Sequence, residues 1–436
     1  MNIIYIHTHD SGRYISPYGH ALPSPGLMRF AEEGTLFRQA YNCGPTCSPS
    51  RAALLTGMVP HSAGMLGLAH RGFELNDYSR HLAAFLKKNG YATALCGIQH
   101  EAPKEKVHEL GYDFIYKSAN PDARLADYDT AEQACAWLKQ KHDKPFFLSA
   151  GFFNTHRPFP EPGHDFSPDR ILPPGCLPDT ESVRRDMCGY AASLKIADEC
   201  TGRVLDSLQK NGLRGSTLVF FTTDHGMAFP YMKCSLFDGG IGVSLIMDFP
   251  GNSCRGKVLD SLVSHIDIFP TICDLAGIKR PDYLQGVSLL PLFSNEKKEV
   301  RSEIFSEVTF HAAYEPIRAV RTSRYKYIRY FEDYNGIVPA NIDSGYSKTF
   351  LLENGLLQQG HDQELLFDLY FDPAEKNNLL YHEKYRNILG DLSDRMENWM
   401  RATGDPLLDG KIKIPAGAKV NRRDSIHPQD NDFIKE

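Results

Sequence analysis

Short apolar runs alternate with helical patterns along the first 310 residues. Five runs rich in β-branched and aromatic residues are predicted to be strands, at residues 3–7, 91–96, 145–151, 216–223 and 243–247. Between them, apolar residues recur at helical spacing over residues 52–56, 80–88, 130–141, 182–209 and 266–275. Strands that alternate with helices are typical of a parallel sheet with crossover helices. The pattern therefore predicts an α/β fold with a large, mostly parallel sheet flanked by helices.

The pattern changes after about residue 310. Segments 317–322, 325–331 and 365–370 are predicted to be antiparallel strands, and residues 385–400 an amphipathic helix. Residues from 402 onward are rich in Gly, Pro and charge, which is typical of an extended tail. We therefore expect a main α/β domain at residues 1–310 and a smaller C-terminal α+β subdomain, an antiparallel sheet plus helix, at residues 311–436.

Composition narrows the classes of partner. The 436 residues are 42% hydrophobic and carry a net charge of −6, without any block of five Lys or Arg, so neither nucleic acid nor an anionic membrane is expected as a partner. The longest apolar stretches, such as 242–248, are too short for a membrane helix. The chain enters a strand without a signal-peptide pattern, so a soluble, cytoplasmic protein is expected unless such a peptide was removed. The ten scattered cysteines are expected to be mostly buried free thiols.

The most informative segment is Cys-Ser-Pro-Ser-Arg-Ala-Ala-Leu-Leu-Thr-Gly, at residues 47–57. A cysteine that opens a helix, with an arginine four residues on, would lie at the positive helix N-terminus beside a guanidinium. Such a place favours an anion next to Cys47. The first five residues alone fit an ordinary capped helix start equally well.

The whole segment resembles the signature of the type I, formylglycine-dependent sulfatases of the alkaline phosphatase superfamily, Cys-x-Pro-x-Arg followed by Ala-x-Leu-Leu-Thr-Gly. The resemblance implies that a separate formylglycine-generating maturation enzyme converts Cys47 to Cα-formylglycine (3-oxoalanine). It further implies that the hydrated aldehyde attacks sulfur, that an alcohol or amine leaves and that sulfate is then released. Arg51 would support the nucleophile electrostatically.

Two strand ends carry candidate metal ligands. His9-Asp10 follows the first strand, where sulfatases have two aspartates, and Asp224-His225 precedes a glycine as in the family's Asp-Asn/His-Gly. The resemblance implies that these four residues bind a divalent cation that polarises the sulfate. Calcium is the family's usual ion. Two imidazoles among four ligands shift the preference toward manganese or zinc, and calcium stays the first choice by resemblance.

Three further segments continue the resemblance. Gly-Ile-Gln-His, ending at His100, stands where the family has Gly-Lys-x-His, which implies a catalytic base at His100 and a missing lysine at Ile98. Asn154-Thr-His156-Arg-Pro resembles His-x-His-x-Pro, so His156 would bind sulfate or protonate the leaving group. Lys233 matches the sulfate-binding lysine that precedes the acidic/Gly-Gly turn.

Residues outside these motifs are candidates for substrate recognition. His70 and Arg71 follow the nucleophile helix, and His311 lies at the domain junction. Each could contact sugar hydroxyls or an acidic neighbour, or serve the structure alone. Segment 64–68 and Phe229-Pro230 look most like the N-sulfoglucosamine sulfohydrolase branch of the family.

These observations favour a metal-dependent sulfatase that acts on esters or sulfamates of small sulfated carbohydrates, or on aryl sulfates. A phosphonate monoester or phosphodiester hydrolase of the same superfamily is an alternative, toward which His9, His225 and the missing lysine point. A catalytically silent sulfosugar-binding protein is a second alternative, motivated by His9 and Ile98. The exact substrate, the metal and the oligomeric state are not fixed by the sequence.

Overall fold

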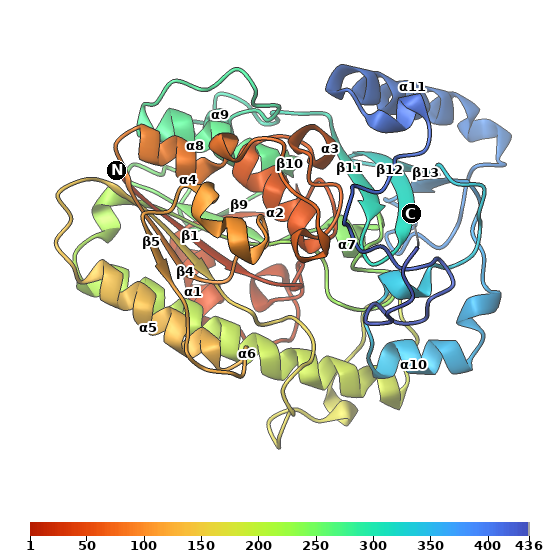
Figure 1. Cartoon of the computed structure of the whole chain (residues 1–436), viewed down its shortest axis with the longest axis horizontal. Coiled ribbons are helices and arrows are strands. Elements are labelled where there is room, and N and C mark those ends of the chain that lie inside the picture. The colour runs from red at the N-terminus through yellow and green to blue at the C-terminus, as the bar shows by residue number, and fades with distance from the viewer. Residues whose placement is uncertain (435–436) are drawn as a thin grey trace.

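An eight-stranded sheet runs through the first part of the computed structural model, which describes residues 1–434 (Figure 1). Its spatial order is β5-β4-β6-β1-β7-β8-β2-β9, with the strands β1 (Asn2–Thr8), β2 (Thr35–Phe37), β4 (Ala92–Gly97), β5 (Phe114–Tyr116), β6 (Phe146–Gly151), β7 (Thr217–Thr223), β8 (Leu245–Asp248) and β9 (Lys257–Leu259). The five strands from β5 to β7 are parallel neighbours, whereas β8 is antiparallel to β7 and β2. The predicted α/β fold with a mostly parallel sheet is confirmed.

The side chains of β1 alternate between two apolar cores because successive residues of a strand point to opposite faces. Ile3 and Tyr5 belong to one core, and Ile4 and Ile6 to the other. The first core is covered by α2 (Cys47–Thr56), α4 (Leu82–Lys88) and α8 (Ile268–Ala276). The second is covered by α1 (Pro25–Glu33), α5 (Ala126–Leu138) and α6 (Glu181–Lys210), of which α5 and α6 are seen below the sheet in Figure 1.

The predicted strands and helices of this part are all present, with boundaries that differ by a few residues. The main difference is α2, which begins at Cys47 rather than at residue 52. The sequence analysis did not predict the nine-residue helix α1. It also missed strands and helices of two to four residues, which are too short for a period to show: β2, β5, β9, the paired β3 (Ala40–Tyr41) and β10 (Val263–Ser264), and the helices α3 (Pro60–Ala63), α7 (Asp238–Ile241) and α9 (Leu290–Phe293).

A four-stranded antiparallel sheet with the order β11-β12-β13-β14 forms the C-terminal part. Its strands are β11 (Glu303–Phe310), β12 (Tyr314–Thr322), β13 (Tyr325–Tyr330) and β14 (Glu364–Asp368). The helix α11 (Arg386–Thr403) matches the predicted one, and α10 (Tyr346–Glu353) was not predicted. The sheet begins at residue 303, before the division expected at residue 310. The division of the chain into two domains stays a prediction.

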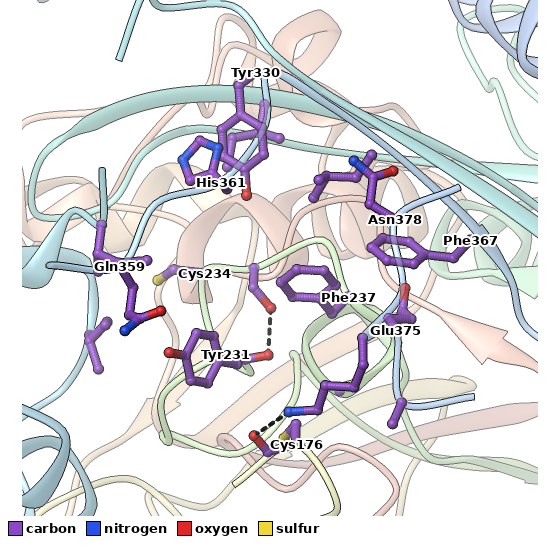
Figure 2. A pocket seen from close by; sticks show the side chains of 18 of the residues that line it. Cys176, Tyr231, Cys234, Phe237, Tyr330, Gln359, His361, Phe367, Glu375 and Asn378 are labelled. Atoms are coloured by element: carbon purple, nitrogen blue, oxygen red, sulfur yellow. Dashed lines mark hydrogen bonds between the residues drawn. The ribbon is translucent and has the colours of Figure 1, made fainter. Parts of the chain in front are cut away.

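The two faces of this second sheet have different partners. Val320 and Tyr327 pack in one apolar core with Met396 of α11. On the other face, Ile328 packs in a core with Leu236 of the main domain. Beyond this contact, a cavity of about 850 Å³ lies between the second sheet and the chain around residues 231–239 (Figure 2).

The expectation for the cysteines is confirmed within the described residues: all ten thiols are free, and eight of them are buried. In the same part of the chain, no helix combines the length and the apolar character that crossing a membrane requires.

Candidate active site

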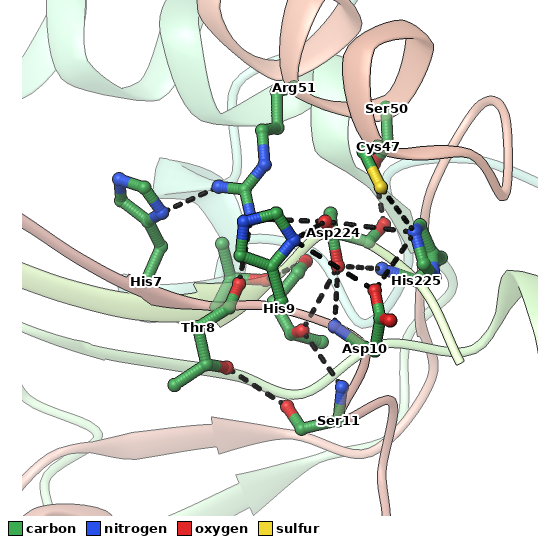
Figure 3. A network of polar contacts seen from close by, with 12 residues as sticks. His7, Thr8, His9, Asp10, Ser11, Cys47, Ser50, Arg51, Asp224 and His225 are labelled. Atoms are coloured by element: carbon green, nitrogen blue, oxygen red, sulfur yellow. Dashed lines mark hydrogen bonds and ion pairs between the residues drawn. The ribbon is translucent and has the colours of Figure 1, made fainter. Parts of the chain in front are cut away.

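The strands β1 and β7 bring the two predicted metal segments together. The two strands are paired in parallel register up to Thr8 and Thr223, so the residues that follow them meet at one edge of the sheet. Asp10 then donates its backbone N–H to Asp224 Oδ1 at 2.8 Å. The N-terminus of α2 lies above this edge and places Cys47 over the cluster (Figure 3).

His9, Asp10, Asp224 and His225 form a buried polar cluster in which each residue is at most 2% exposed. His9 Nδ1 lies 3.1 Å from Asp224 Oδ2, and His225 Nε2 lies 3.3 Å from Asp10 Oδ1. Ligand atoms of Asp10, Asp224 and His225, together with the Cys47 thiol, all lie within 4.8 Å of one another. His9 belongs to a second group of this kind, with Asp10, Cys47 and His156, so the four predicted ligands are divided between two adjoining groups that share Asp10 and Cys47.

This donor set fits a divalent cation. Among the described residues, the buried His9 Nε2 has no hydrogen-bond partner, and His9 Nδ1 and Asp10 Oδ1 lie at ion-pair distance from Asp224 and His225 without the geometry of a hydrogen bond. Burying polar atoms without partners is costly, and a bound cation would satisfy them. Two imidazoles with two carboxylates match manganese and zinc as well as calcium.

Cys47 is 3% exposed, and its Sγ lies 3.5 Å from His225 Nε2. Burial raises the pKa of this thiol strongly, and Lys233 opposes the shift only in part. The unmodified side chain is therefore a neutral thiol at neutral pH and a weak nucleophile, because the thiolate is the reactive form.

Arg51 lies one helical turn after Cys47, and its guanidinium reaches from α2 into the cluster (Figure 3). Its Nη2 donates to Asp224 Oδ2 at 3.0 Å and to the carbonyl of Thr8 at 2.9 Å, while Nη1 lies 2.5 Å from His7 Nδ1. Burial alone would raise the pKa of Asp224, but the charges of His225 and Arg51 hold it well below its usual value. Arg51 thus keeps this carboxylate ionised.

Lys233 is buried between two carboxylates. Its Nζ lies 3.2 Å from Asp10 Oδ2 and 2.9 Å from Asp343 Oδ2. Burial would lower the pKa of this amine, but Asp10 and Asp343 raise it well above its usual value. Asp343 comes from the C-terminal part of the chain, and the sequence analysis missed it because no motif surrounds it.

Two histidines lie beside His9, and a third lies beside one of them. The ring centroid of His100 lies 4.7 Å from that of His9, and that of His156 lies 5.3 Å away. His70 follows at 6.4 Å from His100 and is exposed to solvent. Burial and the charge of Arg51 hold the pKa of His100 well below its usual value, and burial with Arg71 lowers that of His70 to about 4. Neutral imidazoles can accept protons or coordinate a metal.

The loop that carries His156 is held by Asp127 of α5. This carboxylate accepts hydrogen bonds from the backbone of Phe153 at 2.7 Å and from the backbone and side-chain amides of Asn154 at 2.9 and 2.7 Å. Ser193 of α6 donates to the side-chain oxygen of Asn154 at 2.6 Å. Asn154, where the family has histidine, therefore serves to anchor the loop.

The remaining predicted residues differ in their surroundings. His311 is buried, its Nδ1 lacks a hydrogen-bond partner, and burial with the charge of Lys233 lowers its pKa. Arg71 is bonded to the C-terminal tail, with Nη1 at 2.7 Å from Asn421 Oδ1 and Nη2 bonded to the carbonyl of Pro428. Arg71 thus has an anchoring contact that the sequence did not indicate, and substrate binding by it stays a prediction. Ile98 occupies the position at which the family has a lysine, and its side chain carries no charge.

Comparisons with known proteins agree with this geometry. The sequence model of the family described as Sulfatase matches residues 1–278, and that described as N-sulphoglucosamine sulphohydrolase, C-terminal, matches residues 224–338. An Ulvan-active sulfatase of Formosa agariphila is 29% identical, with 97% of this chain and 77% of the relative covered. The N-sulphoglucosamine sulphohydrolase of Homo sapiens is 28% identical, with 93% and 91% covered.

The fold is also shared with an enzyme of another activity. The crystal structure of phosphonate monoester hydrolase of Agrobacterium radiobacter superposes with a TM-score of 0.74 at 20% identity, and the match covers 97% of this chain and 99% of that one. Such a likeness concerns the fold alone.

Proposed function

Because this chain belongs to the sulfatase family, we propose that it hydrolyses sulfate esters or sulfamates of small sulfated carbohydrates at the cluster around Cys47 and releases inorganic sulfate. The observation that carries the proposal is the position of Cys47. Its thiol, at the N-terminus of α2, lies within 4.8 Å of ligand atoms of Asp10, Asp224 and His225. A nucleophile and candidate metal ligands thus meet at one buried point.

Cys47 is the residue to be modified. Converted to Cα-formylglycine by a maturation enzyme, it supplies a hydrated aldehyde as the nucleophile. The thiol's high pKa supports this assignment, because the unmodified residue would not ionise at neutral pH. The helix N-terminus on which it lies also favours the negative charge of a sulfate.

His9, Asp10, Asp224 and His225 would hold the divalent cation, calcium first by resemblance, with manganese or zinc as alternatives. When bound, such a cation polarises a sulfate oxygen. Charge supports the assignment: the carboxylates of Asp10, Asp224 and Asp343 face the two cations Arg51 and Lys233. The net charge of these five groups is −1, which would repel sulfate. A bound divalent cation would change this net charge to +1, which would attract sulfate.

The surrounding cations and imidazoles would handle the substrate. Lys233 binds a sulfate oxygen, His156 protonates the leaving oxygen or nitrogen, and His100 accepts a proton from the hydrated aldehyde. The positions of His100 and His156 beside His9 support these roles. His70, Arg71 and His311 are proposed to contact the sugar.

An N- or O-sulfated amino sugar is the substrate class that we favour. The support is the match of residues 224–338 to the C-terminal model of N-sulphoglucosamine sulphohydrolase and the likeness to the human enzyme of that name. Phosphonate monoester hydrolysis is the second candidate, favoured by the two imidazoles at the metal cluster and by the absence of a lysine at position 98.

The first test is mass spectrometry of the peptide that contains Cys47, after co-expression with a formylglycine-generating enzyme. We expect a loss of about 18 Da relative to the thiol, as Cys becomes the aldehyde. A thiol that persists while a control sulfatase is converted would contradict the proposed nucleophile and favour a silent sulfosugar-binding protein.

The second test compares substrates on the converted protein. Glucosamine N-sulfate, an aryl sulfate and an aryl phosphonate monoester are assayed beside Cys47→Ala, which lacks the residue to be modified. We expect sulfate release well above the Cys47→Ala control. Faster turnover of the phosphonate than of either sulfate would instead assign the chain to the second candidate function.

A further inference from the structure

The cavity between the C-terminal sheet and the main domain is separate from the proposed catalytic centre. Of the twelve residues predicted for the site, only Lys233 lines it. The ammonium of Lys233 is engaged with Asp10 and Asp343, and neither of these carboxylates lines the cavity. Lys233 thus contributes to the wall between the two spaces. The volume of about 850 Å³ lies in the range of small-molecule pockets.

Aromatic rings form a large part of the cavity wall (Figure 2). Tyr330 stacks on His361 with ring centroids 3.8 Å apart, which holds both rings in place. The wall also includes Tyr14, Tyr231, Phe237 and Phe367. Flat, rigid faces of this kind pack against the C–H faces of sugar rings, and tyrosine adds a hydroxyl for hydrogen bonding.

Polar groups suited to hydroxyl and ammonium donors stand among these rings. The lining includes the amides of Asn335, Asn341, Gln359 and Asn378. Glu315 accepts a hydrogen bond from Asn341 Nδ2 at 2.8 Å, and no described residue forms an ion pair with it. Burial raises the pKa of Glu315 to about 7, because the hydrogen bond from Asn341 and the charge of Arg423 compensate the buried carboxylate only in part. An ammonium group placed beside Glu315 would complete that compensation.

Carboxyl groups outnumber ammonium groups in the lining, with Glu315, Asp362 and Glu375 against Lys233 and Lys376. No arginine lines the cavity among the described residues, and the ammonium of Lys376 donates to the carbonyl of Cys176 at 3.2 Å. Glu375 is paired with Lys326 at 2.7 Å, whereas the described residues that donate hydrogen bonds to Asp362, Asn378 and Tyr381, are both neutral. Glu315 and Asp362 therefore leave the cavity with unpaired carboxyl groups, in contrast to the centre at Cys47.

We propose that this cavity is a second binding site, which takes a free amino sugar with its ammonium group at Glu315 and excludes sulfated sugars. The aromatic walls would pack on the ring, and the amides would bind its hydroxyls. A free amino sugar is the class of product that sulfamate hydrolysis releases. The binding itself does not rest on the proposed reaction at Cys47.

Binding is tested on full-length Cys47→Ala protein, which keeps the cavity and removes the residue needed for turnover. Glucosamine, glucose and glucosamine N-sulfate are titrated by calorimetry into this protein and into the same protein with Glu315→Gln. The second change keeps the size of the side chain and an acceptor for Asn341. Exposed Glu383→Gln is the matched control, and His156→Gln tests for binding at the catalytic centre. Circular dichroism checks that each variant is folded.

We expect glucosamine to bind more tightly than glucose, and glucosamine N-sulfate not to compete with it at this site. Glu315→Gln should weaken glucosamine binding about tenfold, as expected for loss of one charge-assisted hydrogen bond. Glu383→Gln and His156→Gln should leave it unchanged. The proposal is overturned if none of the three sugars binds, if only His156→Gln weakens binding, or if the sulfated sugar binds in a manner sensitive to Glu315.

Discussion

Acid sensitivity of the fold can be tested at a single histidine. His81 is fully buried, at the N-terminus of α4, where its Nδ1 accepts a hydrogen bond from the backbone of Ala83 at 3.2 Å. Burial lowers its pKa from 6.5 to about 3, because a charged imidazole would lose its hydration. The change His81→Asn keeps an acceptor at the helix N-terminus and removes the titrating ring.

The sign and size of the effect follow from proton linkage. The folded protein keeps His81 neutral, so its contribution to stability is complete above pH 6.5 and is lost as the pH falls from 6.5 toward 3. At pH 5, which is about 1.5 units below the pKa of 6.5 in the unfolded chain, protonation of His81 stabilises the unfolded chain. At 1.36 kcal/mol per unit, this lowers the free energy of unfolding by about 2 kcal/mol. At pH 7 the smaller Asn side chain costs stability through lost packing against Tyr112, whose ring centroid lies 5.8 Å away.

Urea unfolding followed by circular dichroism at pH 7, 6 and 5 measures both effects. The original protein should lose about 2 kcal/mol more than His81→Asn between pH 7 and pH 5. Exposed His164→Asn controls for the general effect of replacing a histidine. If the original protein and His81→Asn lose stability in parallel, the buried, neutral state of His81 is wrong.

Three further predictions concern the catalytic centre and its support. Gly226→Ala should lower sulfatase kcat/KM more than tenfold with a modest loss of thermal stability, because a Cβ there would overlap the carbonyl of Gly239 and shift the neighbouring His225; unchanged kinetics would contradict this. Arg318→Met should lower the free energy of urea unfolding by about 3–5 kcal/mol, since it leaves the buried Asp405 without its partner; a loss below about 1 kcal/mol would refute it. Chelation should abolish sulfate release, and readdition of calcium, manganese and zinc in turn should identify the ion, whereas full activity of metal-free protein would exclude one.

Most of the longer elements could be predicted from the sequence because their apolar residues recur with a clear period, although α1 and β11 were missed. The strand β1 and the helix α6 were found within one or two residues of their ends. Elements such as β2 and β9 have three residues each, and their strand character comes from pairing with distant partners. Local sequence does not contain that information.

The candidate site was predicted where its residues lie in motifs at strand ends. Asp10 and Asp224 follow adjacent parallel strands, so the topology alone brings them together. Asp343 could not be found in this way, because it lies in an irregular segment between Asn341 and α10 whose path depends on tertiary contacts. One such contact is Lys348, whose ammonium donates to the carbonyl of Ile342 at 2.7 Å.

The two parts of the chain form one centre rather than a catalytic domain with an independent appendage. The chain that follows Lys233 is bonded to the second sheet: Lys326 of β13 donates to the carbonyl of Leu236 at 3.1 Å and pairs with Asp238 at 2.6 Å. On the other side, Asp343 pairs directly with the ammonium of Lys233. Lys233, for which we propose sulfate binding, is thus positioned through contacts on both sides by residues of the C-terminal part. The charge and position of Lys233 therefore depend on the packing of the C-terminal part against the main domain. The main domain alone would lack a complete site.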